Sequence, residues 1–124
     1  MYEILPSADR LFAVRLGETL TADEIEALYE AVGKRFESQP RLNYYVDATA
    51  YRHLGPEAFV EGVKQRLAHL GWLSRFDRVA IVTDSPLIRT VAGVFDVLTP
   101  SMAVRVFEPD RAADALAWAG ETSG

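Results

Sequence analysis

The sequence predicts an α/β fold, with one mostly parallel sheet of about five strands and about four helices. Two observations support this prediction. Short apolar or alternating runs typical of strands recur between longer stretches with helical spacing. Strands that alternate with helices in this way need crossover connections, which make neighbouring strands parallel. The 124 residues have the usual size of one domain, and we expect residues 1–124 to form a single one.

The first elements are two strands followed by a helix. An apolar run over residues 2–5 and alternation over residues 11–16 predict strands joined by a turn. Thr21 and Glu24 have the spacing of a capping box, which predicts a helix start, and the helix should end near Ser38. Its apolar residues form one stripe: Ile25, Leu28, Tyr29, Val32 and Phe36.

The middle of the chain predicts two more strands with a helix between them. The run Leu42–Val46 favours a pleated sheet and is followed by Asp47 at its carboxyl end. Pro56 suits the first turn of a helix over residues 55–71, because its missing N–H is not needed there. The continuous apolar run Val79–Val82 is typical of a strand covered on both faces, and we expect it at the centre of the sheet.

Two helices and a strand complete the predicted fold. Ser85 before Pro86 indicates the start of a helix over residues 86–98, whose apolar arc is unusually wide. Alternation predicts a last strand over residues 104–107, and a final helix follows over residues 109–120. The residues of this last helix that we expect to face inward are Ala113, Leu116, Ala117 and Trp118.

Composition excludes several classes of protein. With 49% hydrophobic and 25% charged residues and a mean hydropathy of +0.01, the chain resembles an ordinary soluble globular protein. The absence of Cys excludes disulfide scaffolds, thiolate metal sites and Cys nucleophiles. A net charge of −5 without a basic stripe argues against nucleic-acid binding. We expect no signal peptide, because the first residues show no basic segment followed by an apolar one, and no membrane span, because no apolar run approaches about 18 residues.

Polar side chains gather where two predicted strands end: Asp47, Thr49, Thr83, Asp84 and Ser85. Ligands of open α/β sheets bind at this carboxyl edge. The acids, the hydroxyls and the helix start at Ser85 suit a small anion or a phosphorylated residue. We favour the structural alternative over this interpretation, because the same residue types cap turns and helices in most proteins.

Common catalytic patterns do not match. A phosphotransfer site of receiver type requires a Lys after the last strand, whereas Lys34 and Lys64 lie on predicted helices. Neither a Gly-rich phosphate loop nor a Gly-x-Ser-x-Gly elbow is present. His53 and His69 lack metal-ligand spacing, although His53 is a candidate general base. We therefore expect no catalytic residues, no metal site and no cofactor.

The wide apolar arc of the helix over residues 86–98 is a candidate interaction surface. If the sheet covers one side of the arc, the other side needs a partner subunit or an acyl-chain ligand. Alternatively, a small domain buries the helix without a partner. The candidate interface residues are Leu87, Val91, Val94, Leu98 and Trp72.

Strand, cap and core signals recur in a specific order along nearly the whole chain, in these segments: Tyr2-Glu3-Ile4-Leu5-Pro6, Leu11-Phe12-Ala13-Val14-Arg15, Leu20-Thr21, Tyr45-Val46-Asp47, Gly55-Pro56-Glu57-Ala58, Arg78-Val79-Ala80-Ile81-Val82 and Ala115-Leu116-Ala117-Trp118. In this order and spacing they resemble the STAS-like, or SpoIIAA-like, family of small bacterial domains. The resemblance implies a STAS-like α/β fold, a cytoplasmic bacterial setting and, for most members, no established catalytic activity.

The resemblance also bears on regulation. In the related anti-sigma-factor antagonists, an Asp ending the third strand is followed by an Asp-Ser-Ser-Gly element whose Ser is phosphorylated to release a partner kinase. Asp47 matches the strand-end Asp, but the next helix start reads Leu54-Gly55-Pro56-Glu57, without Ser or Thr. The phosphoswitch is therefore not carried over.

These observations predict a non-enzymatic binding or regulatory domain that engages a protein partner or a small ligand as a homodimer. The family's structural kinship to lipid-binding domains implies one alternative, a carrier of an apolar ligand with a cavity beneath the helix over residues 86–98. The other alternative is a small enzyme or phosphoacceptor that uses the carboxyl edge of the sheet, with His53 as its base.

Overall fold

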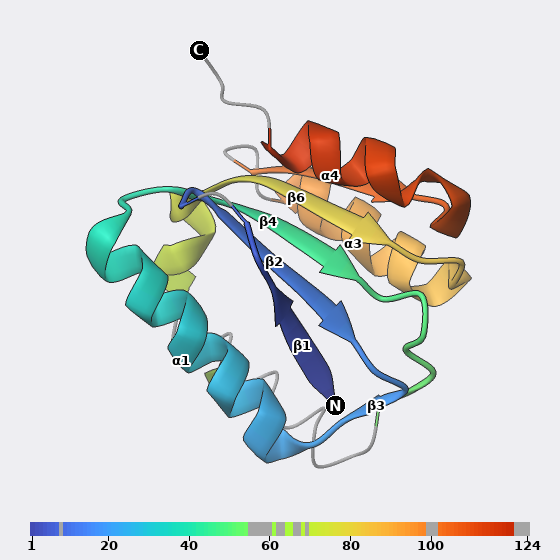
Figure 1. The fold of residues 1–124 in the computed structure, drawn as a ribbon, viewed down its shortest axis with the longest axis horizontal. Coiled ribbons are helices and arrows are strands. Elements are labelled where there is room, and N and C mark those ends of the chain that lie inside the picture. Colours follow the sequence, from blue (N-terminus) through green and yellow to red (C-terminus); the bar gives the residue numbers. More distant parts are fainter. Residues whose placement is uncertain are drawn as a thin grey trace.

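The computed structural model describes residues 1–7, 9–54, 61, 64–65, 68, 70–98 and 102–120. Its main sheet has five strands in the order β1-β2-β4-β6-β7 (Figure 1). These strands are β1 (Tyr2–Leu5), β2 (Leu11–Leu16), β4 (Leu42–Asp47), β6 (Phe76–Val82) and β7 (Ala103–Phe107). Strands β1 and β2 pair antiparallel, and the other neighbouring pairs are parallel. The predicted α/β class with a mostly parallel sheet is confirmed.

The part of the chain that the structure describes has three α-helices, against the four or so expected. They are α1 (Ala22–Ser38), α3 (Pro86–Leu98) and α4 (Ala112–Gly120). Most of the helix predicted over residues 55–71 lies outside the described residues, but the four described positions before η1 are helical: Glu61, Lys64, Gln65 and Ala68. The end of the predicted helix overlaps a short 3-10 helix, η1 (Leu70–Arg75). A second 3-10 turn, η2 (Pro109–Arg111), precedes α4.

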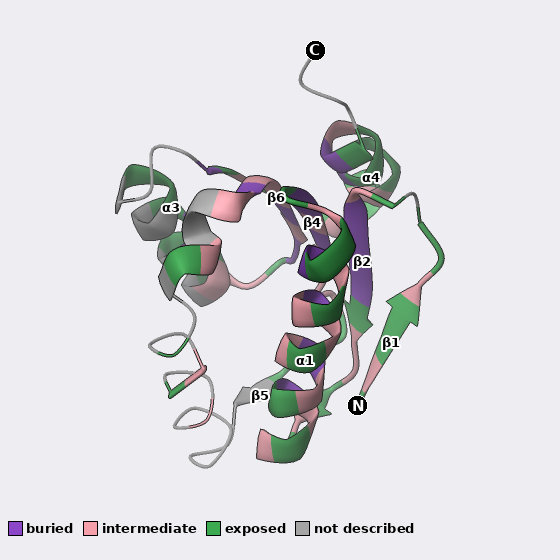
Figure 2. Cartoon of the chain, turned by 90° about the vertical axis from the view of Figure 1, so that its left-hand side faces the viewer, coloured by how far each residue is buried: buried purple, intermediate pink, exposed green. Residues whose placement is uncertain are grey.

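The hydrophobic core has two parts, one on each face of the sheet. Leu11 and Ala13 of β2 belong to the cluster that includes residues of α4, whereas Phe12 and Val14 belong to the cluster that includes residues of α1. Successive side chains of a strand point to opposite faces, so β2 contributes to both clusters. Figure 2 shows the resulting buried stretch of β2, with α1 and α4 beside it.

Helix α1 forms as the sequence predicts. The hydroxyl of Thr21 accepts a hydrogen bond from the Glu24 amide at 3.2 Å, and the Glu24 carboxylate accepts one from the Thr21 amide at 3.0 Å. This capping box satisfies two amide groups that have no partner within the helix. The buried residues of α1 are Ile25, Leu28, Val32 and Phe36, as predicted, and Tyr29 is partly buried.

The strand predicted at Val79–Val82 needs correction. It begins at Phe76, and it is internal but not central, because β4 holds the middle of the sheet. The charged residues Asp77 and Arg78 interrupt the apolar run, although the backbone continues as a strand through them. The apolar run therefore misses the start of the strand, where the buried Phe76 lies before the two charged residues.

The prediction for the inward face of α4 is also wrong. Ala115 and Ala119 are buried, whereas Ala113 and Ala117 are exposed and Leu116 is 43% exposed. Among the predicted residues, Trp118 does pack against the core. Helix α4 starts only after η2, and the small side chains at its buried positions let it lie close to the sheet.

A small second sheet has no counterpart in the sequence predictions. Strands β3 (Thr19–Leu20) and β5 (His53–Leu54) pair in parallel, and the Arg52 amide donates a hydrogen bond to the Glu18 carbonyl at 3.0 Å. Two-residue strands carry no measurable periodicity, so they cannot be recognised from the pattern of the sequence. This pairing ties the segment after β4 to the segment that leads into α1.

Candidate functional site

The carboxyl ends of β4 and β6 lie next to each other, as the sequence predicts for the candidate site. Asp47 is the register partner of Val82, and the Ala48 amide donates a hydrogen bond to the Val82 carbonyl at 2.9 Å. The two loops that follow therefore start side by side, one with Thr49 and the other with Thr83. The backbone thus brings the predicted residues to one edge of the sheet.

Asp47 holds the turn that follows its own strand. One carboxylate oxygen accepts a hydrogen bond from the Thr49 amide at 3.0 Å, and the other lies 3.5 Å from Nε of Arg15 on β2. The Asp47 side chain is 17% exposed, whereas Arg15 is 55% exposed, so water screens this ion pair from the arginine side. The carboxylate acts here as the cap of a turn and as the partner of a neighbouring strand.

Thr83 and Ser85 form a second set of caps. Thr83 is 1% exposed; its amide donates to the Phe107 carbonyl at 3.0 Å, and its hydroxyl oxygen accepts from the Ser85 amide at 3.0 Å. The Ser85 hydroxyl oxygen in turn accepts from the Ile88 amide at 3.3 Å. Ser85 therefore caps the start of α3, as its position before Pro86 predicts.

Asp84 differs from Asp47, Thr83 and Ser85 because it accepts no backbone hydrogen bond in the described part of the chain. Its side chain is 56% exposed, and its recorded partner is Arg52, whose Nη1 lies 3.9 Å away. The same Nη1 donates to the carbonyls of Thr49 and Tyr51 at 2.8 and 3.1 Å. Arg52 thus links the loop after β4 to Asp84, a role that no local pattern in the sequence indicates.

Among the described side chains of this edge, the geometry shows caps of turns and helices. The polar groups of Asp47, Thr83 and Ser85 face amides of their own loops, and in the described part of the chain no three His, Asp or Glu side chains gather as metal ligands. The side chain of His53 and all of His69 lie outside what the structure describes. Burial raises the pKa of the nearby Tyr51 hydroxyl, which keeps its proton at neutral pH.

The candidate interface on α3 is tested only in part. The structure describes the backbone of α3 but not the side chains of Leu87, Val91, Val94 and Leu98, so their role stays a prediction. Ala92 on the same helix is buried, whereas Val97 is 77% exposed. Trp72, the other predicted interface residue, lies on η1 and packs against the α1 side of the core.

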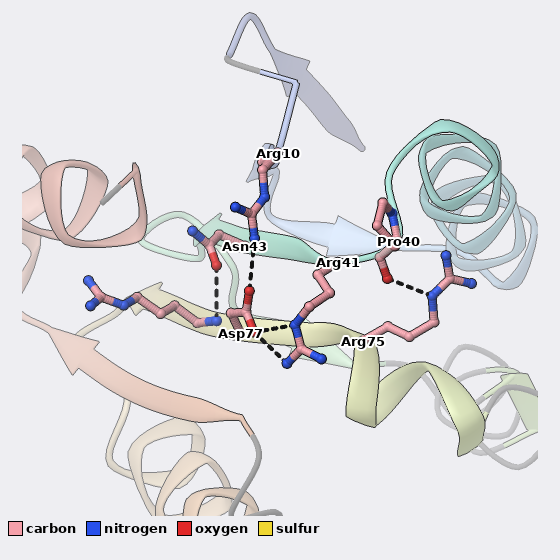
Figure 3. A network of polar contacts seen from close by, with 7 residues as sticks. Arg10, Pro40, Arg41, Asn43, Arg75 and Asp77 are labelled. Carbon is pink, nitrogen blue, oxygen red and sulfur yellow. Dashed lines mark hydrogen bonds and ion pairs between the residues drawn. The ribbon is translucent and has the colours of Figure 1, made fainter. Parts of the chain in front are cut away.

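The amino edge of the sheet holds a second polar network, which the sequence analysis does not predict (Figure 3). Arg10 lies before β2 and Arg41 before β4, and both contact the carboxylate of Asp77 on β6; Arg10 Nη2 is 3.0 Å and Arg41 Nε 2.6 Å from it. Asn43 accepts a hydrogen bond from the Arg78 amide at 3.2 Å. These contacts tie together the starts of three neighbouring strands.

Comparison with known proteins places the chain in a family. The model of the SpoIIAA-like family matches residues 11–120. The structure is similar to that of an uncharacterised protein of the DUF3478 family with a SpoIIAA-like fold from Shewanella loihica PV-4, with a TM-score of 0.69 and 25% sequence identity over 95% of this chain and 91% of that one.

No curated protein matches the chain. No helix in the described ranges combines the length and the apolar character needed to cross a membrane. The predicted resemblance is confirmed by the family match, which covers nearly the whole chain, and by the SpoIIAA-like fold of the similar structure. The chain belongs to the SpoIIAA-like family.

Proposed function

We propose that this chain is a non-enzymatic binding or regulatory domain that engages a protein partner through the carboxyl edge of its sheet. The observation that carries the proposal is the use of the edge side chains as caps. Asp47, Thr83 and Ser85 each accept a hydrogen bond from an amide two or three residues further along the chain. Such bonds fix the shape of the loops, which is what a recognition surface needs.

The regulatory mechanism proposed for this domain does not depend on a phosphorylated serine after β4. Asp47 occupies the strand-end position of the anti-sigma-factor antagonists, but residues 54–57 carry no Ser or Thr. Membership of the SpoIIAA-like family supports a bacterial cytoplasmic setting. The homodimer also belongs to the proposal: it rests on the wide apolar arc that the sequence predicts for α3, because a contiguous apolar face that the sheet does not cover favours contact with a second copy.

The experiment that tests the proposal compares two strand-end acids by urea-induced unfolding. We expect Asp47→Ala to lower the free energy of unfolding by about 1 kcal/mol, because the Thr49 amide loses its cap and Arg15 loses a partner. Asp84→Ala is the matched control, since this side chain is 56% exposed and accepts no backbone hydrogen bond in the described structure. Its unfolding free energy should change by less than about 0.5 kcal/mol.

The proposal fails if Asp47→Ala is as stable as the unchanged protein. A carboxylate held in a shielded position without stabilising the fold would indicate a group kept for chemistry or for a ligand. That result would favour the small-enzyme or phosphoacceptor interpretation of the same edge.

A further inference from the structure

Strand β1 forms one edge of the main sheet, and in the part of the chain that the structure describes no strand pairs with its outer side. Figure 2 shows β1 at the margin of the molecule, with β2 beside it. The opposite edge strand is better protected, because the Val104 amide of β7 donates a hydrogen bond to the Asp96 carboxylate of α3 at 3.1 Å. An unpaired edge strand is a template on which another chain can add a strand.

The register of β1 shows which of its backbone groups face outward. Residues of an antiparallel pair alternate between those that bond the opposite strand and those whose N–H and C=O groups point away from it. The Gly17 amide donates to the Met1 carbonyl at 2.6 Å, so the odd-numbered residues of β1 bond β2. The N–H and C=O groups of Tyr2 and Ile4 therefore point away from β2, toward the position of an incoming strand.

Charged side chains form a row across three strands that ends on β1. Glu3 lies opposite Arg15 of β2, and Arg15 lies opposite Asp47 of β4. Arg15 Nη1 is 3.3 Å from the Glu3 carboxylate, and Arg15 Nε is 3.5 Å from that of Asp47. The sign of the charge thus alternates along the row, and its last member, Glu3, is 64% exposed. Because opposite charges on neighbouring strands stabilise their pairing, the row favours a basic residue at the next position.

The other face of β1 favours apolar residues on an incoming strand. Ile4 lies on this face and is 43% exposed, and Tyr2, two residues before it, is only partly buried. Successive side chains of a strand point to opposite faces, so a strand with a basic residue beside Glu3 places its two flanking residues on the face of Ile4. Apolar side chains at these two positions would cover Ile4.

We propose that β1 adds an extended segment of a partner protein to the main sheet, with an arginine or lysine opposite Glu3 and an apolar residue on either side of it. The backbone groups of Tyr2 and Ile4 provide the hydrogen bonds, and Glu3 provides the selectivity. A second copy of this chain fits less well, because the two-fold pairing that uses all four outward groups places Glu3 opposite Glu3. The inference rests on the proposed function in taking the partner to be a protein.

The test is an NMR titration of the chain with a peptide that has blocked ends and the sequence Thr-Val-Arg-Val-Thr. We expect the amide signals of Tyr2 and Ile4 to shift until they saturate, and their exchange with solvent to become slower. The amides of Glu3 and Leu5 already bond β2, so their exchange should not change. Protection of alternate amides distinguishes an added strand from side-chain contacts or a general change in the fold.

A charge reversal tests the role of Glu3. A peptide with Glu in place of Arg should bind the unchanged chain about fivefold more weakly, and Glu3→Arg should reverse this preference. The Glu3–Arg15 pair is exposed on both sides, so its loss should cost little stability. Asp110→Arg is the matched control: it makes the same change in total charge at an exposed position after β7, the opposite edge strand, and should keep the preference for the Arg peptide within about twofold.

The inference is overturned if the Arg peptide leaves the exchange of the Tyr2 and Ile4 amides unchanged, or if the two peptides bind equally well. Glu3→Arg without a reversed preference contradicts the role of Glu3. Protection of the same two amides that rises with protein concentration, without peptide, would show that a second copy occupies β1 in place of a partner. The comparison of Asp47→Ala with Asp84→Ala is made without peptide, so its failure and a failure of this inference are distinguishable.

Discussion

Thr83 shows that a single side chain can fix the shape of a loop at the carboxyl edge. It is almost fully buried, and its hydroxyl oxygen accepts a hydrogen bond from the Ser85 amide at 3.0 Å. The Ser85 hydroxyl then caps α3 by accepting from the Ile88 amide. The turn between β6 and α3 therefore depends on two consecutive caps. The first cap, the Thr83 hydroxyl, is buried, so water cannot take over its hydrogen bond to the Ser85 amide.

We predict that Thr83→Val lowers the free energy of unfolding by about 1–2 kcal/mol, because the Ser85 amide loses its acceptor in a buried place. Urea-induced unfolding followed by circular dichroism measures the change. Thr90→Val is the matched control, since the exposed Thr90 hydroxyl only donates to the Pro86 carbonyl within α3. Equal stability of the two variants would mean that the Thr83 hydroxyl does not hold this turn.

The sequence predicts the identity of these capping residues but not their long-range partners. Ser85 before Pro86 and Asp47 before Thr49 are local patterns, and the structure places their caps within three residues. The contacts of Arg15 with Asp47 and of Arg52 with Asp84 join segments that are distant in sequence. Nothing in the neighbourhood of either arginine indicates its partner, because only the pairing of strands brings them together.

At the scale of the elements, the end of α1 depends on a residue from another segment. The guanidinium of Arg75 donates to the carbonyls of Phe36, Gln39 and Pro40 at 2.8, 3.2 and 2.9 Å, and lies 4.1 Å from the centroid of the Phe36 ring. The last carbonyls of a helix have no partner within it and carry a partial negative charge. Arg75 on η1 supplies both the donors and the charge.

We predict that Arg75→Ala lowers the free energy of unfolding by about 2 kcal/mol, because it leaves these carbonyls without donors at the end of α1. Thermal unfolding and the urea midpoint both report the loss. Arg105→Ala is the matched control, since Arg105 is exposed on β7 and its recorded contacts in the described chain are with the rings of Phe107 and Trp118. The account of α1 is wrong if Arg75→Ala is no less stable than Arg105→Ala.

The helices also show where sequence patterns succeed. In α1 the capping box, the apolar stripe and the end at Ser38 are all found as predicted. The start of this helix, its buried face and its end are therefore predictable from the sequence. In α4 nearly every residue is small or apolar, so the sequence pattern does not show which face of the helix is buried. The structure buries Ala115 and leaves Leu116 43% exposed, a choice that the apolar pattern of α4 does not make.

For the whole molecule, polar side chains gather at both edges of the sheet, but they make different contacts at each edge. At the amino edge, Arg10, Arg41 and Asp77 bind one another and tie strand starts together (Figure 3). At the carboxyl edge, side chains bind backbone amides and shape loops. The alternation of strands and helices predicts parallel crossovers, but the strand order depends on contacts between distant segments, so the central place of β4 is not predictable from local patterns.

The central claim, a binding domain that works without a phosphoryl switch, is tested most directly by mass spectrometry of the protein purified from its own source. We predict that the denatured chain has its unmodified mass, and that the native species is a dimer or a complex with a second polypeptide. A gain of roughly 80 Da that persists on denaturation would reveal a phosphoryl group and contradict the claim. A small molecule that leaves on denaturation would contradict it in favour of a ligand carrier.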